Sequence, residues 1–156
     1  MFIRRIKNVI RWLPVIWNDM DWDHHYFYVI LHTKLSHMEE YIRKFGHHLG
    51  NEKDADDMKI AINTLDRLIE DEYLENALKW HKEKWGNVDI KFVPVIDDDR
   101  GSSIAEFVYD KANTEKDKEQ ARKEFKIAAE HSEYMIEQDL KFLFDFLRKK
   151  IRRWWD

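Results

Sequence analysis

The sequence predicts an all-α fold: an elongated antiparallel helical bundle of about four helices, with one irregular insert at about residues 87–112. The chain has only 4 glycines and 2 prolines in 156 residues, which leaves few places to turn and favours long helices. Apolar residues also recur at alternating spacings of three and four over long stretches. With 44% hydrophobic residues, residues 1–156 are expected to form a single helical domain.

The first predicted helix covers about residues 3–13. Ile6, Ile10 and Leu13 lie on one stripe and cations occupy the remaining surface, so the helix is amphipathic. Pro14 is expected to end it, because proline lacks the backbone N–H that a helix interior requires. The acidic run at 18–23 then supplies N-caps for the next helix.

The second and third helices carry the clearest periodicity and are joined by a short link, which predicts an antiparallel pair. The second begins at about His24, and the third covers about Asp54 to Lys84 before Gly86 stops it. The apolar seam of the second helix consists of Tyr28, Leu31, Leu35, Met38, Ile42, Phe45 and Leu49. The stripe of the third consists of Met58, Ile62, Leu65, Ile69, Tyr73, Ala77 and Trp80.

The segment from Val88 to Val95 alternates weakly and contains Pro94, so it fits an edge strand or a loop, and we expect it to be irregular. Residues 104–109 are expected to add a helical turn. The fourth helix covers about 114–155 and would span about 60 Å. Because a globule of this size has no core of that length, we expect a homo-oligomer. Its stripe consists of Phe125, Ala129, Ser132, Ile136, Leu140, Leu143, Leu147, Ile151 and Trp154.

Positive charge is concentrated at the two ends of the chain. Residues 1–17 and residues 141–156 each carry about +4, which leaves about −12 on the middle of a chain whose net charge is −4. Tryptophans accompany these cations, and a ring beside a cation can stack on a base while the cation neutralises a phosphate. The alternative is that both stretches are solvated helix faces. The predicted ligand-binding residues are Arg4, Arg5, Arg11, Trp12, Trp17, Arg148, Arg152, Arg153, Trp154 and Trp155.

Four motifs resemble a family of helical proteins encoded by tailed bacteriophages. They are WNDMDWDHHY at 17–26, GHHLGNEKDADDMKIAINTLDRLIEDEY at 46–73, WHKEKWG at 80–86 and the closing WWD at 154–156. The resemblance implies a viral origin and a location in the cytoplasm of the bacterial host. It carries over no catalytic residue, cofactor or ligand. Accessory phage proteins of this size often interfere with host defence.

The sequence offers little catalytic chemistry. There is no cysteine, no Glu-x-x-His pair, no phosphate-binding loop and no His-Glu-x-x-His motif, so we expect no cofactor and no metal. Asp21 and His24 have a ligand-like spacing, but capping explains Asp21 better. The pairs Glu72–Glu75 and Glu130–Glu133 match half of the motif of helical pyrophosphatases. A magnesium-dependent nucleotide pyrophosphohydrolase is therefore kept as an alternative.

Several polar residues lie near the apolar stripes of the third and fourth helices. Buried polar groups need partners, so these residues either fix the register of the bundle or face a ligand cavity. Both interpretations stay open, and register fixing is the commoner one. The residues are Glu72, Asn76, Ser132 and Asp139.

The predicted function is that of a non-enzymatic phage accessory protein with a counter-defence role. It would bind and sequester a small phosphorylated or nucleotide-like ligand at a basic aromatic site between subunits. A protein-binding inhibitor of a host enzyme is the main alternative. The acidic middle argues against a long nucleic acid as partner. Apolar residues flank the four cations of the first helix as in an interfacial helix, but one short helix anchors weakly, so no membrane partner is expected.

Overall fold

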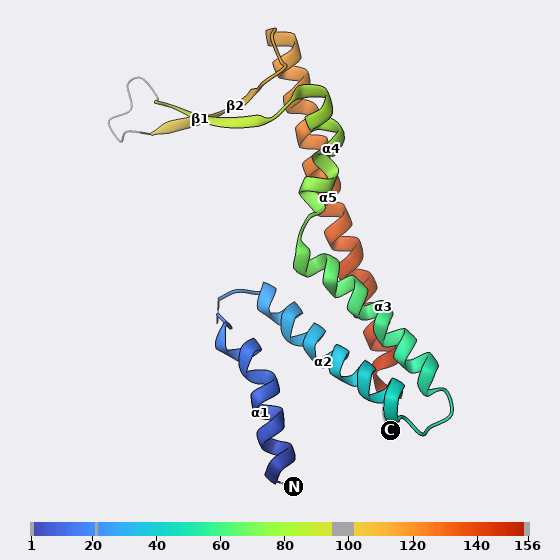
Figure 1. The fold of residues 1–156 in the computed structure, drawn as a ribbon. Helices are drawn as coiled ribbons and strands as arrows, with labels where there is room; N and C mark the ends of the chain where they lie inside the picture. Colours follow the sequence, from blue (N-terminus) through green and yellow to red (C-terminus); the bar gives the residue numbers. More distant parts are fainter. Residues whose placement is uncertain (1, 21, 95–101, 155–156) are drawn as a thin grey trace. The chain divides into compact units, whose positions relative to one another are not determined.

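The computed structural model describes residues 2–20, 22–94 and 102–154, which are mostly helical (Figure 1). The predicted helical character is confirmed, but the all-α class is wrong because a two-stranded antiparallel hairpin is present. None of the described helices has the length and apolar content needed to cross a membrane. The elements are α1 (Phe2–Trp17), α2 (His25–Phe45), α3 (Asn51–Glu70), α4 (Tyr73–Trp85), β1 (Val88–Pro94), β2 (Ser103–Tyr109), α5 (Glu115–Lys150) and a closing 3-10 turn, Ile151–Arg153.

The chain divides into two compact units, and α5 contributes to both. The first unit comprises residues 1–71 and 138–156, and the second comprises residues 72–137. The predictions of a single domain over 1–156 and of a homo-oligomer stay predictions.

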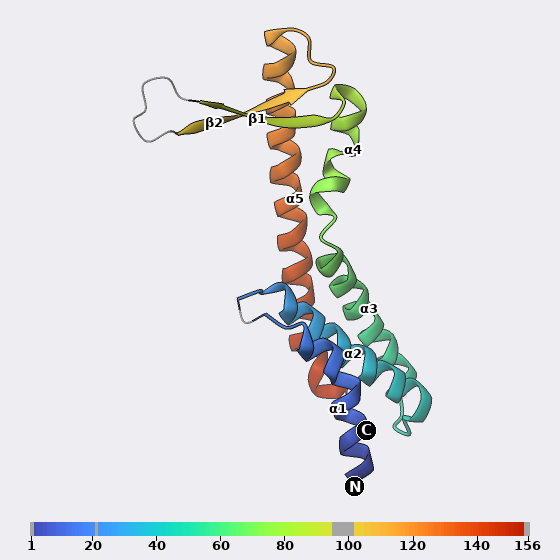
Figure 2. The same cartoon turned by 60° about the vertical axis from the view of Figure 1, so that its left-hand side comes forward.

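Within the first unit, α2 and α3 form the predicted antiparallel pair (Figure 2). His32 Nε2 lies 2.9 Å from Asp66 Oδ1, and Arg43 lies 2.9 Å from Asp56 at the other end of the pair. The end of α5 packs against both helices, with Phe27 of α2 stacked on its Phe144. The buried apolar side chains of this unit are Leu35, Ile42, Ala55, Met58, Ala61, Ile62, Leu65, Leu68, Leu143, Leu147 and Trp154.

The seam predicted for α2 is only partly buried. Leu35 and Ile42 are in the core, but Phe45 and Leu49 are exposed. Their predicted burial is wrong because α2 ends at Phe45, where Gly46 takes an extended conformation with φ −63° and ψ 135°. An Asp23 carboxylate oxygen accepts a hydrogen bond from the backbone N–H of His25 at 3.0 Å, but the N-cap residue of α2 is His24, whose side chain makes no cap hydrogen bond, so the predicted cap is not confirmed.

Pro14 was predicted to end the first helix, and this prediction is wrong. α1 continues through it to Trp17. Proline leaves the carbonyl of the residue four positions earlier without its helical donor. That residue is Ile10, which is exposed, as is Pro14, so water can hydrate the carbonyl.

The third predicted helix is two helices, α3 and α4, with a break at Asp71. Asp71 has a left-handed backbone (φ 49°), and its N–H donates to the Arg67 carbonyl at 3.1 Å, which closes α3. Aspartate tolerates this conformation better than most residues other than glycine. Since the apolar stripe runs on through the junction with no glycine or proline, the sequence pattern conceals the break.

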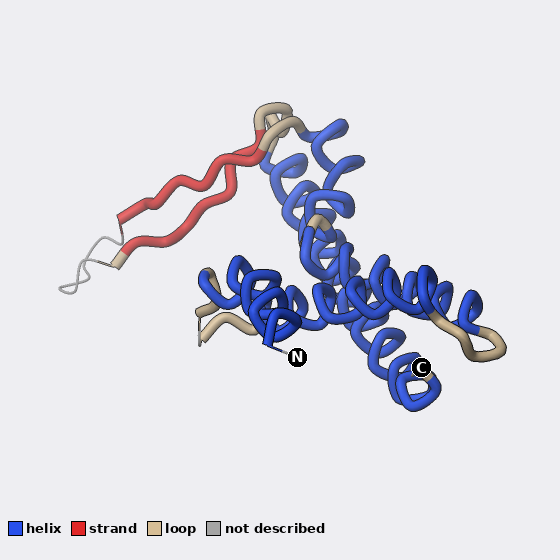
Figure 3. Tube along the Cα trace, turned by 60° about the horizontal axis from the view of Figure 1, so that its bottom comes forward, coloured by secondary structure: helices blue, strands red, loops and turns tan. Residues whose placement is uncertain are grey.

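The second unit contains the hairpin, which the sequence predicted as irregular (Figure 3). β1 and β2 pair from Val88↔Tyr109 to Pro94↔Ser103, so the helical turn predicted at 104–109 is wrong. Pro94 lies at the end of its strand, where its missing N–H costs least. The base of the hairpin is held by a small core in which Tyr109 packs with Trp85, Ala112 and Ala121.

The start of α5 is close to the prediction. Thr114 Oγ1 accepts a hydrogen bond from the N–H of Asp117 at 3.1 Å, and the Asp117 carboxylate accepts one from the N–H of Thr114 at 3.1 Å. The regular helix ends at Lys150, earlier than predicted, and the last turn tightens before Trp154.

Candidate ligand-binding hollow

A hollow of about 570 Å³ lies in the first unit between α1, α2 and Trp154. Its volume falls in the range of small-molecule sites. Among the described residues, three cations and four aromatic or imidazole rings line it, and no carboxylate does. The lining residues are Arg4, Asn8, Arg11, Trp12, Lys34, His37, Met38, Tyr41, Ile42 and Trp154.

Helical periodicity places these side chains together. Arg4, Asn8 and Arg11 are three or four residues apart and therefore share one side of α1. Lys34 and His37 share a side of α2 by the same spacing. α1 thus faces α2 with its polar side.

One cation of the hollow already has a partner in the chain. Arg11 Nη2 lies 3.1 Å from Glu40 Oε2, and the two side chains are 45% and 70% exposed. An ion pair this exposed contributes about 0–1 kcal/mol, so an anionic ligand can compete for the guanidinium. Arg4 and Lys34 are both exposed and line the same space.

Trp12 and His37 form the aromatic wall. Their ring centroids are 5.7 Å apart with an interplanar angle of 82°, an edge-to-face contact. Burial and, to a lesser degree, Arg11 lower the pKa of His37 below its usual value of 6.5. His37 is therefore neutral near pH 7, and it can donate one hydrogen bond and accept another.

Trp154 closes the hollow and carries an unsatisfied donor. Its side chain is nearly fully buried (3% exposed), and its indole Nε1 has no hydrogen-bond partner within the described part of the chain. Leaving a buried donor unpaired costs about 1–3 kcal/mol. The nitrogen has almost no accessible surface, so an acceptor atom of a ligand in the hollow would remove that cost once the Trp154 ring turns its N–H toward the hollow.

The structure brings together four of the ten predicted ligand-binding residues. Arg4, Arg11, Trp12 and Trp154 line the hollow. Five others lie elsewhere on the first unit and are exposed: Arg5, Trp17, Arg148, Arg152 and Arg153. Trp155 lies outside the described residues.

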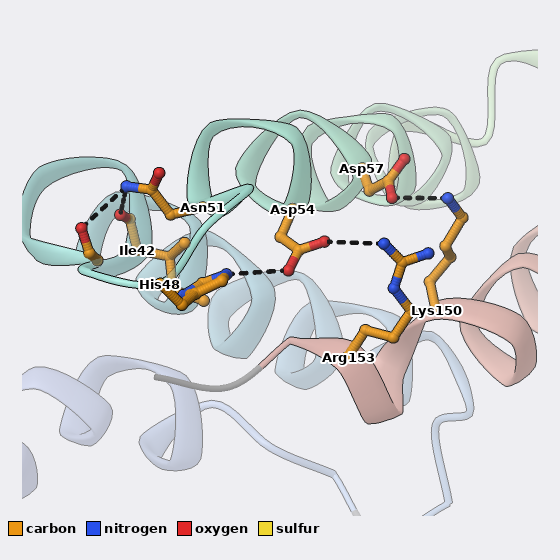
Figure 4. A network of polar contacts seen from close by, with 8 residues as sticks. Ile42, His48, Asn51, Asp54, Asp57, Lys150 and Arg153 are labelled. Carbon is orange, nitrogen blue, oxygen red and sulfur yellow. Dashed lines mark hydrogen bonds and ion pairs between the residues drawn. The ribbon is translucent and has the colours of Figure 1, made fainter.

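Two of the cations near the end of the chain have a structural role that the sequence did not reveal (Figure 4). Lys150 Nζ lies 2.7 Å from Asp57 Oδ2, and the guanidinium nitrogen Nη2 of Arg153 lies 4.0 Å from Asp54 Oδ1. Asp54, which is buried, also meets His48 at 3.1 Å. These contacts tie the end of α5 to α3 and so place Trp154 beside the hollow.

One of the polar residues near the stripes follows the register interpretation, and a second is satisfied within its own helix. The Asp139 carboxylate accepts two hydrogen bonds from Arg67, at 2.7 and 2.8 Å, and so links α5 to α3. Ser132 is buried and donates to the Ala129 carbonyl of its own helix at 2.8 Å. Glu72 and Asn76 are exposed.

Lys34, His37, Met38 and Tyr41 were not predicted as site residues. Their spacing on one side of α2 is the signal that could have found them. Met38 was assigned to the apolar seam of α2, and Lys34, His37 and Tyr41 lie beside that seam. Their role becomes visible only when α1 is placed against them.

A second, larger space does not match this combination. A space of about 700 Å³ beside α4 is bordered by that helix alone, so it is an open helix face. Among the described residues, no group of three or more His, Asp or Glu side chains is arranged to hold a metal ion. Glu72, Glu75, Glu130 and Glu133 therefore do not form the carboxylate cluster that the pyrophosphohydrolase alternative requires.

Comparisons with protein families, with curated proteins and with solved structures found no match to this chain. The resemblance to a phage family therefore stays an expectation from the four motifs.

Proposed function

We propose that the chain is a non-enzymatic phage accessory protein that binds and sequesters a small phosphorylated or nucleotide-like molecule in the hollow. The observation that carries the proposal is the convergence of three cations and four rings on one space, beside the unpaired indole N–H of Trp154. The phage and counter-defence setting rests on the motif resemblance.

The roles of the side chains follow from their chemistry. Arg4, Arg11 and Lys34 would meet the phosphate oxygens, with the guanidinium groups able to form paired hydrogen bonds. The ring of Trp12 or Tyr41 would lie against a base. The Trp154 indole would donate to a ligand acceptor. The described lining residues all come from one chain.

Binding can be tested with AMP, ATP and inorganic pyrophosphate as probes. The proposal predicts quenching of tryptophan fluorescence, a raised melting temperature and saturable heat in calorimetry. Incubation with ATP and Mg²⁺ should leave the nucleotide intact, whereas released product would support the pyrophosphohydrolase alternative.

Variants locate the site. Arg4→Gln and Lys34→Gln should each weaken binding about tenfold, the effect of losing one charge-assisted hydrogen bond. Arg152→Gln is the matched control, because it also removes one exposed cation but lies outside the hollow. A protein that ignores all three probes, or that loses equal affinity in the control, would overturn the proposal. Indifference to the probes would favour an inhibitor that binds a host protein.

A further inference from the structure

The outer side of α1 carries a continuous apolar surface that no described element covers. We call it the outer arc, and its aliphatic members are Ile3, Ile6, Val9, Ile10, Leu13 and Ile16, all exposed. Trp17 ends it with 79% of its surface exposed. At 3.6 residues per turn these side chains fall within about 140° of the helix circumference.

The orientation of α1 is the reverse of the usual one. Helices of soluble domains turn the apolar stripe inward and the polar side to water. Here Arg4, Asn8 and Arg11 line the hollow, and the apolar side faces away from the unit. A contiguous exposed apolar patch of this kind marks an interaction surface.

Charge distinguishes between the partners that could cover the outer arc. α1 carries four cations and no acidic residue. Helical spacing places Arg5 and Lys7 along the two opposite borders of the arc, and both are exposed. Two copies meeting through this surface would bring like charges together, which opposes association. An anionic surface would instead be attracted to both borders.

We propose that the outer arc binds the surface of an anionic lipid bilayer, with α1 lying in the plane of the headgroups. Apolar side chains on one side, cations at the borders and a tryptophan at the end are the features of interfacial helices. α1 has 16 residues, fewer than the roughly 20 needed to span a bilayer.

The sequence alone argued against a membrane partner because a single short helix is a weak anchor. The structure adds that the aliphatic side chains of the outer arc are exposed, so that no refolding is needed before they meet lipid. The arc and the hollow lie on opposite sides of α1. Lipid binding therefore does not depend on the ligand proposed above.

The test is flotation of the full chain with vesicles of phosphatidylcholine alone and of phosphatidylcholine mixed with phosphatidylglycerol. The protein should float with the anionic vesicles and stay in solution with the neutral ones. Added salt should weaken the binding, because the attraction of the border cations is screened.

Substitutions assign the binding to the arc. Ile10→Ser should weaken vesicle binding about tenfold, as expected when one aliphatic side chain no longer leaves water. Ile127→Ser is the matched control: Ile127 on α5 is 60% exposed and Ile10 is 63% exposed, but only Ile10 belongs to the arc. Lys7→Gln should weaken binding about fivefold through loss of one cation.

Three outcomes would overturn the proposal. They are absence of binding to anionic vesicles, equal losses in the Ile10→Ser and Ile127→Ser variants, and a self-association without vesicle binding that Ile10→Ser abolishes in sedimentation velocity. The last result would assign the arc to a second copy of the chain. Circular dichroism of each variant verifies that the helices remain folded.

Discussion

Replacing Lys150 with methionine should selectively destabilise the first unit. Lys150 Nζ lies 2.7 Å from Asp57 Oδ2 and 5.7 Å from the centre of the Phe146 ring. Methionine keeps a long apolar side chain beside that ring but removes the charge. The Asp57 carboxylate, only 12% exposed, would lose the partner that compensates its burial.

The size of the effect follows from the exposure of the two groups. Exposed ion pairs contribute about 0–1 kcal/mol, and removal of one partner from a fully buried pair costs about 3–5 kcal/mol. The Lys150 side chain is 24% exposed, which places this pair between the two limits. We expect Lys150→Met to lower the free energy of unfolding by about 2 kcal/mol.

Native-state hydrogen exchange of the α3 amides measures this loss within the first unit. A loss of about 2 kcal/mol should accelerate exchange about 30-fold. The control is Arg148→Met, because Arg148 pairs with Asp145 at 3.3 Å with 74% and 47% exposure, so its removal should change little.

A double variant tests the pairing itself. Lys150→Met with Asp57→Leu should cost less than the sum of the two single changes, because no charge is left unpaired. Equal effects of Lys150→Met and Arg148→Met, or strictly additive losses in the double variant, would refute the reasoning.

Three further predictions concern pH and backbone conformation. Hydrogen bonds from Lys84, Gln120 and Trp85 lower the pKa of Glu124 from 4.5 to about 2. Their contribution to stability is therefore complete above pH 4.5 and is lost as the pH falls towards 2. Melting temperatures measured over this pH range should show the loss in the natural protein and not in Glu124→Gln. A phosphate in the hollow should raise the lowered pKa of His37, so calorimetric affinity for ATP should increase from pH about 8 to about 6, and His37→Gln should remove the trend. Asp71→Gly should raise the free energy of unfolding by about 0.5 kcal/mol and Asp71→Val should lower it by about 1 kcal/mol, because only glycine adopts φ 49° without strain. A urea denaturation experiment in which the valine variant is more stable than the glycine variant would contradict this account.

The sequence predicted the elements whose periodicity reflects burial. Leu35 and Ile42 of α2, Met58 and Leu65 of α3 and Leu143 of α5 all lie in the core of the first unit, as their spacing indicated. Burial makes such positions apolar at a helical period, so the pattern can be read without the structure.

Elements that bury little gave no comparable signal. Every residue of β1 is exposed, so pairing with β2 leaves only weak alternation in the sequence. The break at Asp71 depends on one left-handed residue, which the pattern does not mark. In α1 the apolar stripe was recognised from its spacing, but the spacing does not show that the stripe faces outward, against the rule for helices of soluble domains.

The candidate site was predicted only in part, because the sequence shows its side chains but not the contacts that they make in the fold. Its cations and tryptophans stand out in the composition, and this identified Arg4, Arg11, Trp12 and Trp154. Local sequence does not reveal which cations pair with buried acids in another helix. Lys150 and Arg153 meet Asp57 and Asp54 across more than 90 residues of chain, so only the fold separates structural cations from those that line the hollow.

The indole N–H signal of Trp154 in a ¹H–¹⁵N spectrum, assigned by its loss in Trp154→Phe, tests the central claim most directly. Titration with ATP should move this signal saturably, because the unpaired donor gains an acceptor. The signal of Trp85, whose Nε1 already donates to Glu124 at 2.6 Å in the second unit, should stay in place. A Trp154 signal that remains fixed while ATP binds, or that moves no more than that of Trp85, would contradict the assignment of the hollow as the ligand site.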